Sequence, residues 1–423
     1  MKKRIVLIGA GSLLYSRQIA GSLMDSEDTA ESELVLQDID LDRVGIVCRY
    51  IQKLAEKKNS PLFVRLETDR GKALENADFV IVTVAIGGLA MKKLDVEICA
   101  AHGVLQVKGD TTGPAGVFRA LRSIPFFLEL AADMERICPN ALLINVSNPL
   151  STITGAIVKY SRVRTIGLCT SVLGMERDFA QKLGVSQERL TVVSAGVNHF
   201  TWLTDLYLDG KQRMDLLRDV IVPDMDGLPV TCELFRAYGM FPIPGYKYAS
   251  EFFLGCEEAA GFSAFNAEAA KEEFSKAMSA AGDELSGKRP FTLKHGGMDS
   301  EVLVALMKSA AIPVPGIYTL NCPNRGQLPW LPEGCVTEGP AYVCGDCISP
   351  LCPGNFTGSV KKLLSDTAYR YSLTVEAAVN GGRREALDAL YADPLVPSIR
   401  AAIGLLEDFL RMQGQYLPQF AAV

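Results

Sequence analysis

The chain has 423 residues, of which 48% are hydrophobic, and its formal net charge is −6 at pH 7. That length exceeds what one hydrophobic core usually holds, which predicts two domains, and the acidic balance without a basic stripe argues against nucleic-acid or membrane partners. Eleven scattered cysteines, and an N-terminal apolar stretch too short for a signal peptide, predict reduced thiols and a cytoplasmic location.

Short β-branched runs alternate with helical stretches over residues 1–170. We expect strands at "RIVLIGAG", "ELVLQDID", "FVRLET", "FVIVTVA" and "LLINVSNP", and helices near 17–24 and over 42–57. Such alternation indicates βαβ units. The fold class is therefore α/β, with an N-terminal Rossmann-type doubly wound parallel sheet that we expect to bind a dinucleotide.

The pattern changes over residues 171–423. "LTVVSAG" and "FTWLTDLYLDGKQ" predict strands, and the second contains an Asp-Gly turn signal. Long helical stretches follow at 264–286 and 299–308, and the end of the chain has helix-period apolar positions. We predict a mixed α+β C-terminal domain that binds metal and substrate.

A glycine turn follows the first predicted strand. Gly9, Gly11 and Ser12 stand where backbone amides and a helix N-terminus can hold a pyrophosphate, although Leu14 replaces the third glycine of the usual fingerprint. Asp38 ends the next strand, where a carboxylate would bind the ribose hydroxyls. Together these residues favour NAD; nearby Arg43 leaves NADP as an alternative, and a glycine turn that serves only the fold is another.

Three further strand ends carry polar side chains at the edge where open α/β sheets bind ligands. "INVSNP" supplies Asn145 and Asn148, whose amides could bind a nicotinamide carboxamide or a sugar hydroxyl, or could only cap a turn. Cys169 ends "RTIGLC", and His199 follows "SAGVN". A thiolate and an imidazole would leave metal positions open for substrate, as a catalytic site requires, but a satisfied core histidine is an equal alternative.

The other histidines and the closely spaced cysteines have simpler interpretations. His102 lies beside a predicted helix C-terminus, and His295 precedes a pair of glycines in a loop. Cys344 and Cys347 of "CGDC" have no matching second pair for zinc, so we interpret them as incidental or structural thiols.

At this point the motifs resemble those of glycoside hydrolase family 4, the NAD- and divalent-metal-dependent glycosidases with a lactate and malate dehydrogenase-like fold. The matching motifs, in order, are "GAGS", "LVLQDIDLDR", "HGVLQVKGDTTGPAGVFRALRSIP", "NVSNP", "GLCTSVLG", "GVNHFTWL", "FPIPGYKYASEFF", "NCPNRGQLPWLP" and "AVNGGRREALDALYADPLV". "GDTTGPAGVFRALRSIP" looks most like the branch that acts on unphosphorylated α-galactosides, α-glucosides and hexuronides.

The resemblance implies a role for particular residues. It places the metal ligands at Cys169 and His199, and substrate contacts at Asn148, Asn198, Asp110 and Lys247. The catalytic base position falls on Tyr246. A thiolate-imidazole pair alone suggests zinc, whereas the resemblance implies manganese, and it also implies a homodimer or homotetramer.

The implied reaction is redox-assisted cleavage of a small glycoside. The sugar is oxidised at C3 by NAD⁺, Tyr246 removes the C2 proton, the aglycone is eliminated, and water addition and reduction complete the cycle. The charge of the metal or of adjacent Lys247 would have to favour the Tyr246 phenolate.

This sequence departs from the family's pattern at the residue after the metal cysteine. Thr170 stands where the family commonly has His, Asp or Asn, and in some members that residue is assigned as the general acid. An alcohol cannot act as a general acid near neutral pH, so the leaving step would depend on water, on another residue, or on an aglycone that leaves as a stable anion. We hypothesise a preference for such aglycones. A second departure is that the nearest branch tends to carry Asp at the position of Tyr246 and His at the position of Tyr248.

Two other functions are open. A 2-hydroxyacid dehydrogenase on the same fold would need a catalytic His-Asp pair and arginines that clamp a carboxylate; Arg119 and Arg122 lie in a predicted helix that need not face the site. A non-catalytic NAD-binding homologue could explain Thr170, but the combination of Cys169, His199 and Tyr246 argues against it.

Overall fold

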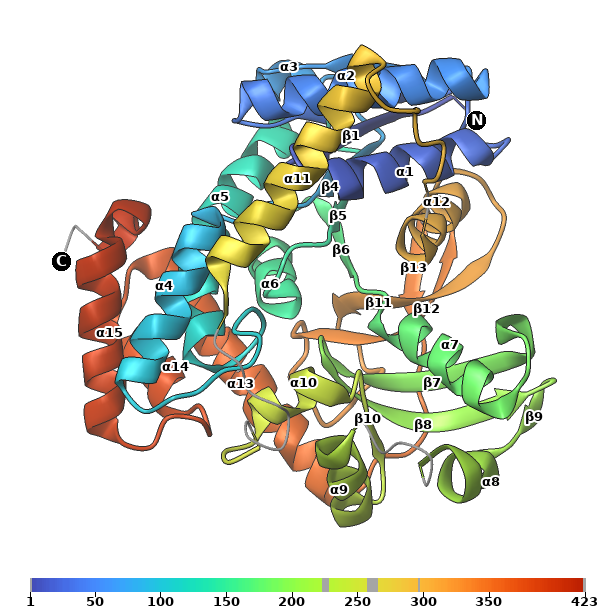
Figure 1. Cartoon of the computed structure of the whole chain (residues 1–423). Coiled ribbons are helices and arrows are strands. Elements are labelled where there is room, and N and C mark those ends of the chain that lie inside the picture. Colours follow the sequence, from blue (N-terminus) through green and yellow to red (C-terminus); the bar gives the residue numbers. More distant parts are fainter. Residues whose placement is uncertain (1, 223–227, 257–264, 296, 421–423) are drawn as a thin grey trace.

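The computed structural model of the chain describes residues 2–222, 228–256, 265–295 and 297–420 (Figure 1). Within its helices, the side chains of residues 246, 247, 298 and 299 lie outside this description. Over the described residues one mixed sheet of 13 strands runs through the molecule in the order β10-β8-β7-β12-β11-β6-β5-β4-β1-β2-β3, with β13 beside β12 and β9 beside β8.

The N-terminal half of the sheet is parallel, which confirms the predicted doubly wound unit. The order β3-β2-β1-β4-β5-β6 is that of dinucleotide-binding sheets. Almost every residue of the central strands is buried, because helices cover both faces of a parallel sheet. The strands are β1 (Arg4–Ile8), β2 (Glu33–Gln37), β3 (Phe63–Leu66), β4 (Phe79–Val82), β5 (Leu142–Asn145) and β6 (Arg164–Leu168).

The helices that connect these strands begin and end at residues with the expected chemistry. In α2 the Asp40 side chain accepts from the Arg43 amide at the start, and Asn59 ends the helix at φ +51°. The predicted span 42–57 is therefore one residue short at each end. The helices are α1 (Leu13–Asp25), α2 (Leu41–Lys58), α3 (Arg70–Leu74), α4 (Gly88–Ala101), α5 (Gly113–Ile137), α6 (Leu150–Tyr160) and α7 (Ser171–Leu183).

The C-terminal half of the sheet is antiparallel and joins the parallel half where β11 pairs with β6. The predicted Asp-Gly turn is confirmed, because Asp209 and Gly210 both have positive φ, at 52° and 73°, between β8 and β9. The strands are β7 (Leu190–Val197), β8 (Phe200–Leu208), β9 (Lys211–Gln212), β10 (Phe241–Ile243), β11 (Gly316–Pro323), β12 (Val336–Cys344) and β13 (Cys347–Pro350).

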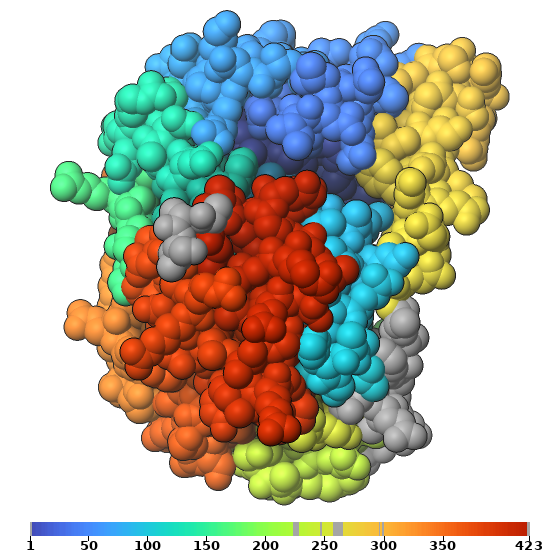
Figure 2. All heavy atoms as spheres, turned by 90° about the vertical axis from the view of Figure 1, so that its left-hand side faces the viewer, coloured from blue at the N-terminus to red at the C-terminus, as the bar shows by residue number. Residues whose placement is uncertain are grey.

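Helices from the C-terminal half pack against the N-terminal half (Figures 1 and 2). Helix α11 crosses α2 and α4, α12 lies beside α1, and α15 packs against α4. The predicted helix at 264–286 begins at 267, after the cap Asn266; residue 264 lies outside the described residues. The helices are α8 (Met214–Leu216), α9 (Pro229–Tyr238), α10 (Tyr246–Ala249), α11 (Ala267–Ser286), α12 (Met298–Ala311), α13 (Gly358–Asn380), α14 (Arg383–Tyr391) and α15 (Ile399–Gln413).

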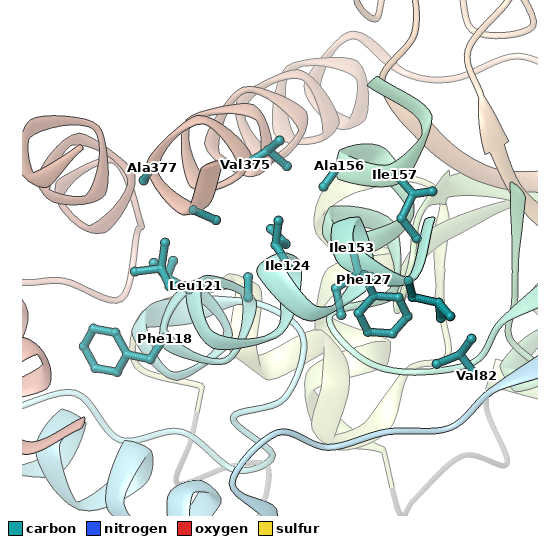
Figure 3. Close-up of a cluster of buried hydrophobic side chains, with 14 of the residues drawn as sticks. Val82, Phe118, Leu121, Ile124, Phe127, Ile153, Ala156, Ile157, Val375 and Ala377 are labelled. Carbon is teal, nitrogen blue, oxygen red and sulfur yellow. The ribbon is translucent and has the colours of Figure 1, made fainter. Parts of the chain in front are cut away.

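The largest buried cluster ties α13 to α5, α6 and the sheet (Figure 3). Full burial of each large apolar side chain contributes roughly 1.5–3 kcal/mol, so the C-terminal helices are held firmly on the N-terminal unit. No helix in the described part of the chain is both long and apolar enough to cross a membrane. The cluster includes Val82, Phe118, Leu121, Ile124, Phe127, Ile153, Ala156, Ile157, Val375 and Ala377.

Candidate functional site

The predicted glycine turn lies between β1 and α1 and leaves the first amides of that helix available. Gly9 has φ +85°, and a Cβ there would lie 2.7 Å from the Thr83 carbonyl oxygen, so only glycine fits. The cap residue Ser12 makes no side-chain hydrogen bond to α1, and the first amides of a helix have no intrahelical acceptor. The turn can therefore receive a pyrophosphate in the way we predicted for a dinucleotide.

Asp38 at the end of β2 faces this turn. Its Oδ2 accepts from the Gly11 amide at 2.7 Å, and its Oδ1 accepts from the Asp40 amide at 3.0 Å. Arg43 pairs with Asp40 at 3.1 Å and its guanidinium lies 4.6 Å from the ring centroid of Phe274 on α11. The Asp38 carboxylate is thus fixed beside the glycine turn, while the Arg43 guanidinium already has two partners.

The two asparagines at and just after the end of β5 have different surroundings. Asn145 is fully buried; its nitrogen donates to the Ser147 carbonyl at 3.3 Å and to Thr154 Oγ1 at 3.2 Å, and its oxygen accepts from the Ser147 amide. This is the turn-capping alternative. Asn148 instead lines a cavity, and its backbone carbonyl oxygen accepts from Arg119 Nε at 2.8 Å.

That cavity, of about 330 Å³, lies where the parallel and antiparallel halves of the sheet meet. Tyr15 and Gln18 of α1 line its cofactor side, and Ser300 and Leu303 of α12 also contribute. The cavity therefore connects the helix that follows the glycine turn with the predicted metal ligands. Its lining also includes Asn148, Cys169, Thr170, Ser171, His199 and Tyr248.

His199 occupies the tight turn between β7 and β8, with φ +61°. Its Nδ1 lies 2.7 Å from Thr111 Oγ1, and the same hydroxyl donates to Asp110 Oδ1 at 2.8 Å. Because the single hydroxyl proton goes to the carboxylate, Nδ1–H of His199 must donate to Thr111. This leaves the Nε2 lone pair free, which is the state that a metal-binding imidazole needs.

The burial of His199 favours the neutral state that this hydrogen-bond pattern requires. Burial lowers the pKa of His199 to about 4, so the imidazole is neutral at physiological pH. Burial opposes ionisation of Asp110 too, but His199, when it is protonated, and the positive charges of Lys92 and Arg119 hold the pKa of Asp110 below its ordinary value. Asp110 therefore stays an acceptor for the Thr111 hydroxyl.

Cys169 follows β6 and is half-buried. Its sulfur lies 3.1 Å from the Ser171 hydroxyl oxygen, and loss of water around the thiol raises the pKa of Cys169 to about 12. A nearby cation is the usual means of ionising such a thiol, so the donor set fits a divalent metal.

The described part of the chain contains no group of three or more His, Cys, Asp and Glu side chains that could hold a metal ion. A metal held by Cys169 and His199 would thus depend on substrate and water for its other positions, as the sequence predicts.

The segment after β10 closes the other side of the cavity. The Tyr248 ring lies on the His199 ring with centroids 3.9 Å apart, and Lys108 Nζ is 5.3 Å from the Tyr248 centroid. The predicted base Tyr246 and its neighbour Lys247 begin α10, but their side chains lie outside the described residues.

Several residues with a place at the site were not predicted from the sequence. Thr111 orients His199, and Glu251 accepts from the Lys108 and Gly109 amides, which holds the loop that carries Asp110 and Thr111. Burial raises the pKa of Glu251 to about 8. The other residues near the site that were not predicted from the sequence are Ser151, Asn321 and Glu338. We predicted that Arg119 need not face the site, but its Nε donates to the backbone carbonyl oxygen of Asn148, which lines the cavity.

The remaining motifs lie elsewhere. His102 is the C-cap of α4 and its Nε2 lies 2.8 Å from Asp408 Oδ2, while His295 contacts Asp25 in a loop. Cys344 and Cys347 face each other across the β12–β13 hairpin, away from the cavity.

Comparison with known proteins identifies the family. The model of the family 4 glycosyl hydrolases matches residues 4–185, and that of their C-terminal domain matches residues 194–396. A probable 6-phospho-beta-glucosidase of Bacillus subtilis is 30% identical over 99% of this chain and 98% of its own. An alpha-galactosidase of the same organism is 27% identical over 99% of this chain and all of its own.

Solved structures agree in fold. A 6-phospho-alpha-glucosidase from gut microorganisms, in complex with NAD and glucose-6-phosphate, superposes with a TM-score of 0.89 at 21% identity over 99% of this chain and all of its own. Lactate dehydrogenase from Eimeria maxima superposes with a TM-score of 0.55 at 15% identity over 90% of this chain and 98% of its own, which confirms the predicted dehydrogenase-like fold. The chain belongs to family 4 of the glycosyl hydrolases.

Proposed function

We propose that this protein cleaves small glycosides in the cavity between the glycine turn and the Cys169–His199 pair. It is an NAD- and divalent-metal-dependent glycosidase, and its relatives include structures described with NAD and with Mn²⁺. The observation that carries the proposal is the cavity itself, because it joins α1 to the thiol and the imidazole. When bound, NAD⁺ and manganese supply the redox and Lewis-acid chemistry that makes the C2 proton of the sugar acidic.

The chain's own residues divide the remaining work. Cys169 Sγ and His199 Nε2 hold the metal, and the Asp110–Thr111 hydrogen-bonded pair keeps the imidazole in the required tautomer. Tyr246 takes the C2 proton, and the charge of Lys247 stabilises its phenolate.

Sugar hydroxyls and the cofactor bind to polar groups around this centre. Asn148 and Asn198 bind sugar hydroxyls beside the metal pair. Gly9, Gly11 and Ser12 receive the pyrophosphate, and Asp38 accepts from the ribose hydroxyls. We assign residues 1–170 to the cofactor and residues 171–423 to metal and substrate.

Thr170 lines the cavity next to Cys169 and cannot protonate a leaving group at neutral pH. We therefore propose that the preferred aglycones leave as stable anions, such as phenolates. Aryl glycosides should turn over faster than alkyl glycosides of the same sugar. Equal kcat/KM values for a matched aryl and alkyl pair would contradict this assignment.

We also propose that the substrates are unphosphorylated, and that the enzyme is a cytoplasmic homodimer or homotetramer. The named relatives include enzymes that act on phosphorylated and on unphosphorylated sugars, so they do not decide between the two branches. The proposal of unphosphorylated substrates rests on the "GDTTGPAGVFRALRSIP" motif. Matched glycosides with and without a 6-phosphate test the branch. Light scattering of the purified protein tests the oligomer.

One experiment tests the whole function. A panel of glycosides is incubated with the enzyme, NAD⁺ and Mn²⁺ in D₂O, and the released sugar is analysed for deuterium at C2. We expect aglycone release, deuterium at C2, and loss of activity in chelator that Mn²⁺ restores better than Zn²⁺. Release without deuterium incorporation, or full activity in chelator, would overturn the mechanism.

A further inference from the structure

Four buried polar side chains form a ring of hydrogen bonds behind the metal pair. Glu338 of β12 is 1% exposed, and its Oε2 accepts from Nδ2 of Asn198 at 2.7 Å and from Nδ2 of Asn321 at 2.8 Å. Ser151 closes the ring: its Oγ accepts from the Asn198 backbone amide at 2.9 Å and donates to Asn321 Oδ1 at 2.8 Å.

The ring determines which way each amide points. The Ser151 hydroxyl has one proton, and it goes to Asn321 Oδ1, so the nitrogen of Asn321 must face Glu338. The nitrogen of Asn198 also faces Glu338, whose Oε2 accepts from it as well as from the nitrogen of Asn321. The oxygen of Asn198 therefore points away from Glu338.

That oxygen has no hydrogen-bond partner within the described structure, although Asn198 is fully buried. An unsatisfied buried acceptor is costly and uncommon in native proteins, so it indicates a missing donor. Asn198 immediately precedes His199, and the side-chain amide of Asn198 hydrogen-bonds to the Cys169 sulfur. The free acceptor thus belongs to a side chain that touches the predicted metal pair.

We propose that Glu338 is a positioning residue that holds the Asn198 amide with its oxygen free to accept a hydrogen bond from a hydroxyl of the bound sugar. The inference rests on the proposed function, since a sugar supplies the missing donor. Glu338 does not touch the sugar and acts only through Asn198. Its distance from Asn198 in the sequence, 140 residues, is bridged by the β7–β12 ladder, in which Glu338 pairs with Gly196.

Four variants separate this role from a structural one. Glu338→Met removes the acceptor at similar length. Glu338→Gln is the matched control, because one amide oxygen can accept both bonds that Oε2 now accepts. Asn198→Asp places two carboxylates in contact, and the double variant N198D/E338Q restores a donor between them. N198D and N198D/E338Q test the same contact between residues 198 and 338 without the methionine substitution, so the inference stays testable if E338M does not fold.

The readout is the inhibition constant of the product monosaccharide and of its monodeoxy analogues, measured by competition with a chromogenic substrate. In the native enzyme, one deoxy analogue should bind about tenfold more weakly than the parent sugar, the effect of one buried hydrogen bond. E338M should bind the parent sugar about tenfold more weakly and no longer distinguish that analogue. E338Q should resemble the native enzyme, and N198D/E338Q should recover what N198D loses.

Three results would overturn the inference. The positioning role of Glu338 is contradicted if folded E338M binds the parent sugar as tightly as the native enzyme does. It is also contradicted if E338M loses the same affinity for every deoxy analogue. The third such result is N198D/E338Q binding no better than N198D. A native enzyme that releases no aglycone and binds no sugar overturns the proposed function together with this inference, whereas an active native enzyme with any of the three results overturns this inference alone.

Discussion

The two halves of the site are held in different ways. On the cofactor side, the turn with Gly9 and Gly11 is shaped by the backbone, and the Asp38 carboxylate is fixed by two backbone amides. On the metal side, His199 and Asn198 are oriented by side chains from distant elements. Conservative side-chain substitutions away from the ligand should therefore damage the metal half much more than the cofactor half.

The largest effect should come from a metal ligand itself. His199→Ala removes one of the two proposed protein ligands, and we expect kcat/KM to fall by a factor on the order of 10³ or more, together with loss of Mn²⁺ binding. His102→Ala is the matched control, because His102 contacts Asp408 at a helix end far from the cavity. Comparable Mn²⁺ affinity in H199A and native enzyme would remove His199 from the metal site.

The next largest effect should be a dependence of the free energy of unfolding on pH, caused by the buried carboxyl group of Glu251 on the metal side of the site. The ordinary pKa of Glu251 is 4.5, and burial raises its pKa to about 8 in the folded protein. Between these values the unfolded chain loses the proton while the folded chain keeps it, so the free energy of unfolding falls as pH rises through this interval. Above pH 8 both states are ionised and the loss is complete.

Glu251→Gln should remove this dependence, because glutamine imitates the protonated acid and can still accept from the Lys108 and Gly109 amides. We expect E251Q to match native stability near pH 5 and to exceed it by on the order of 3 kcal/mol near pH 8 to 9. Urea unfolding at a series of pH values measures the difference. Parallel native and E251Q curves across this range would contradict the assignment.

The same comparison explains what the sequence could predict. The parallel sheet, the glycine turn and Asp38 follow from contiguous patterns, since the glycines, the helix start and the strand lie within one βαβ unit. Cys169 and His199 could be proposed from the sequence because each follows a predicted strand, where polar residues of α/β sheets often contact ligands.

The supporting side chains of the metal half could not be predicted in this way. Thr111, Glu251, Asn321 and Glu338 stand far from His199 in the sequence, and no local spacing connects them with it. The antiparallel pairing of β7, β11 and β12 brings Asn321 and Glu338 to this site, whereas Thr111 and Glu251 come from the loop before α5 and the turn after α10. Asn145 also stands at a strand end, and its side-chain amide bonds to Thr154 and Ser147 close to it in the sequence.

Thr111 offers a sharper test of the metal half. Thr111→Val keeps the shape but removes the hydroxyl that accepts from His199, and loss of such a supporting partner weakens metal binding by about 10- to 100-fold. Thr111→Ser keeps the hydroxyl and should bind Mn²⁺ nearly as well as native enzyme. Titration of the apoenzyme with Mn²⁺ measures both, and equal affinities for T111V and T111S would show that the hydroxyl does not set the tautomer.

The smallest effect should arise on the cofactor side, at Asp38. Asp38→Asn keeps an oxygen for the Gly11 amide but removes the charge that binds the ribose, so NAD⁺ should bind about tenfold more weakly. NADP⁺ should lose less, because the repulsion of its 2′-phosphate disappears as well. Asp40→Asn is the control, since Asp40 caps α2 and pairs with Arg43 at the half-exposed helix start. If D38N and D40N weaken NAD⁺ binding equally, the backbone turn alone holds the cofactor and the Asp38 carboxylate makes no specific contribution.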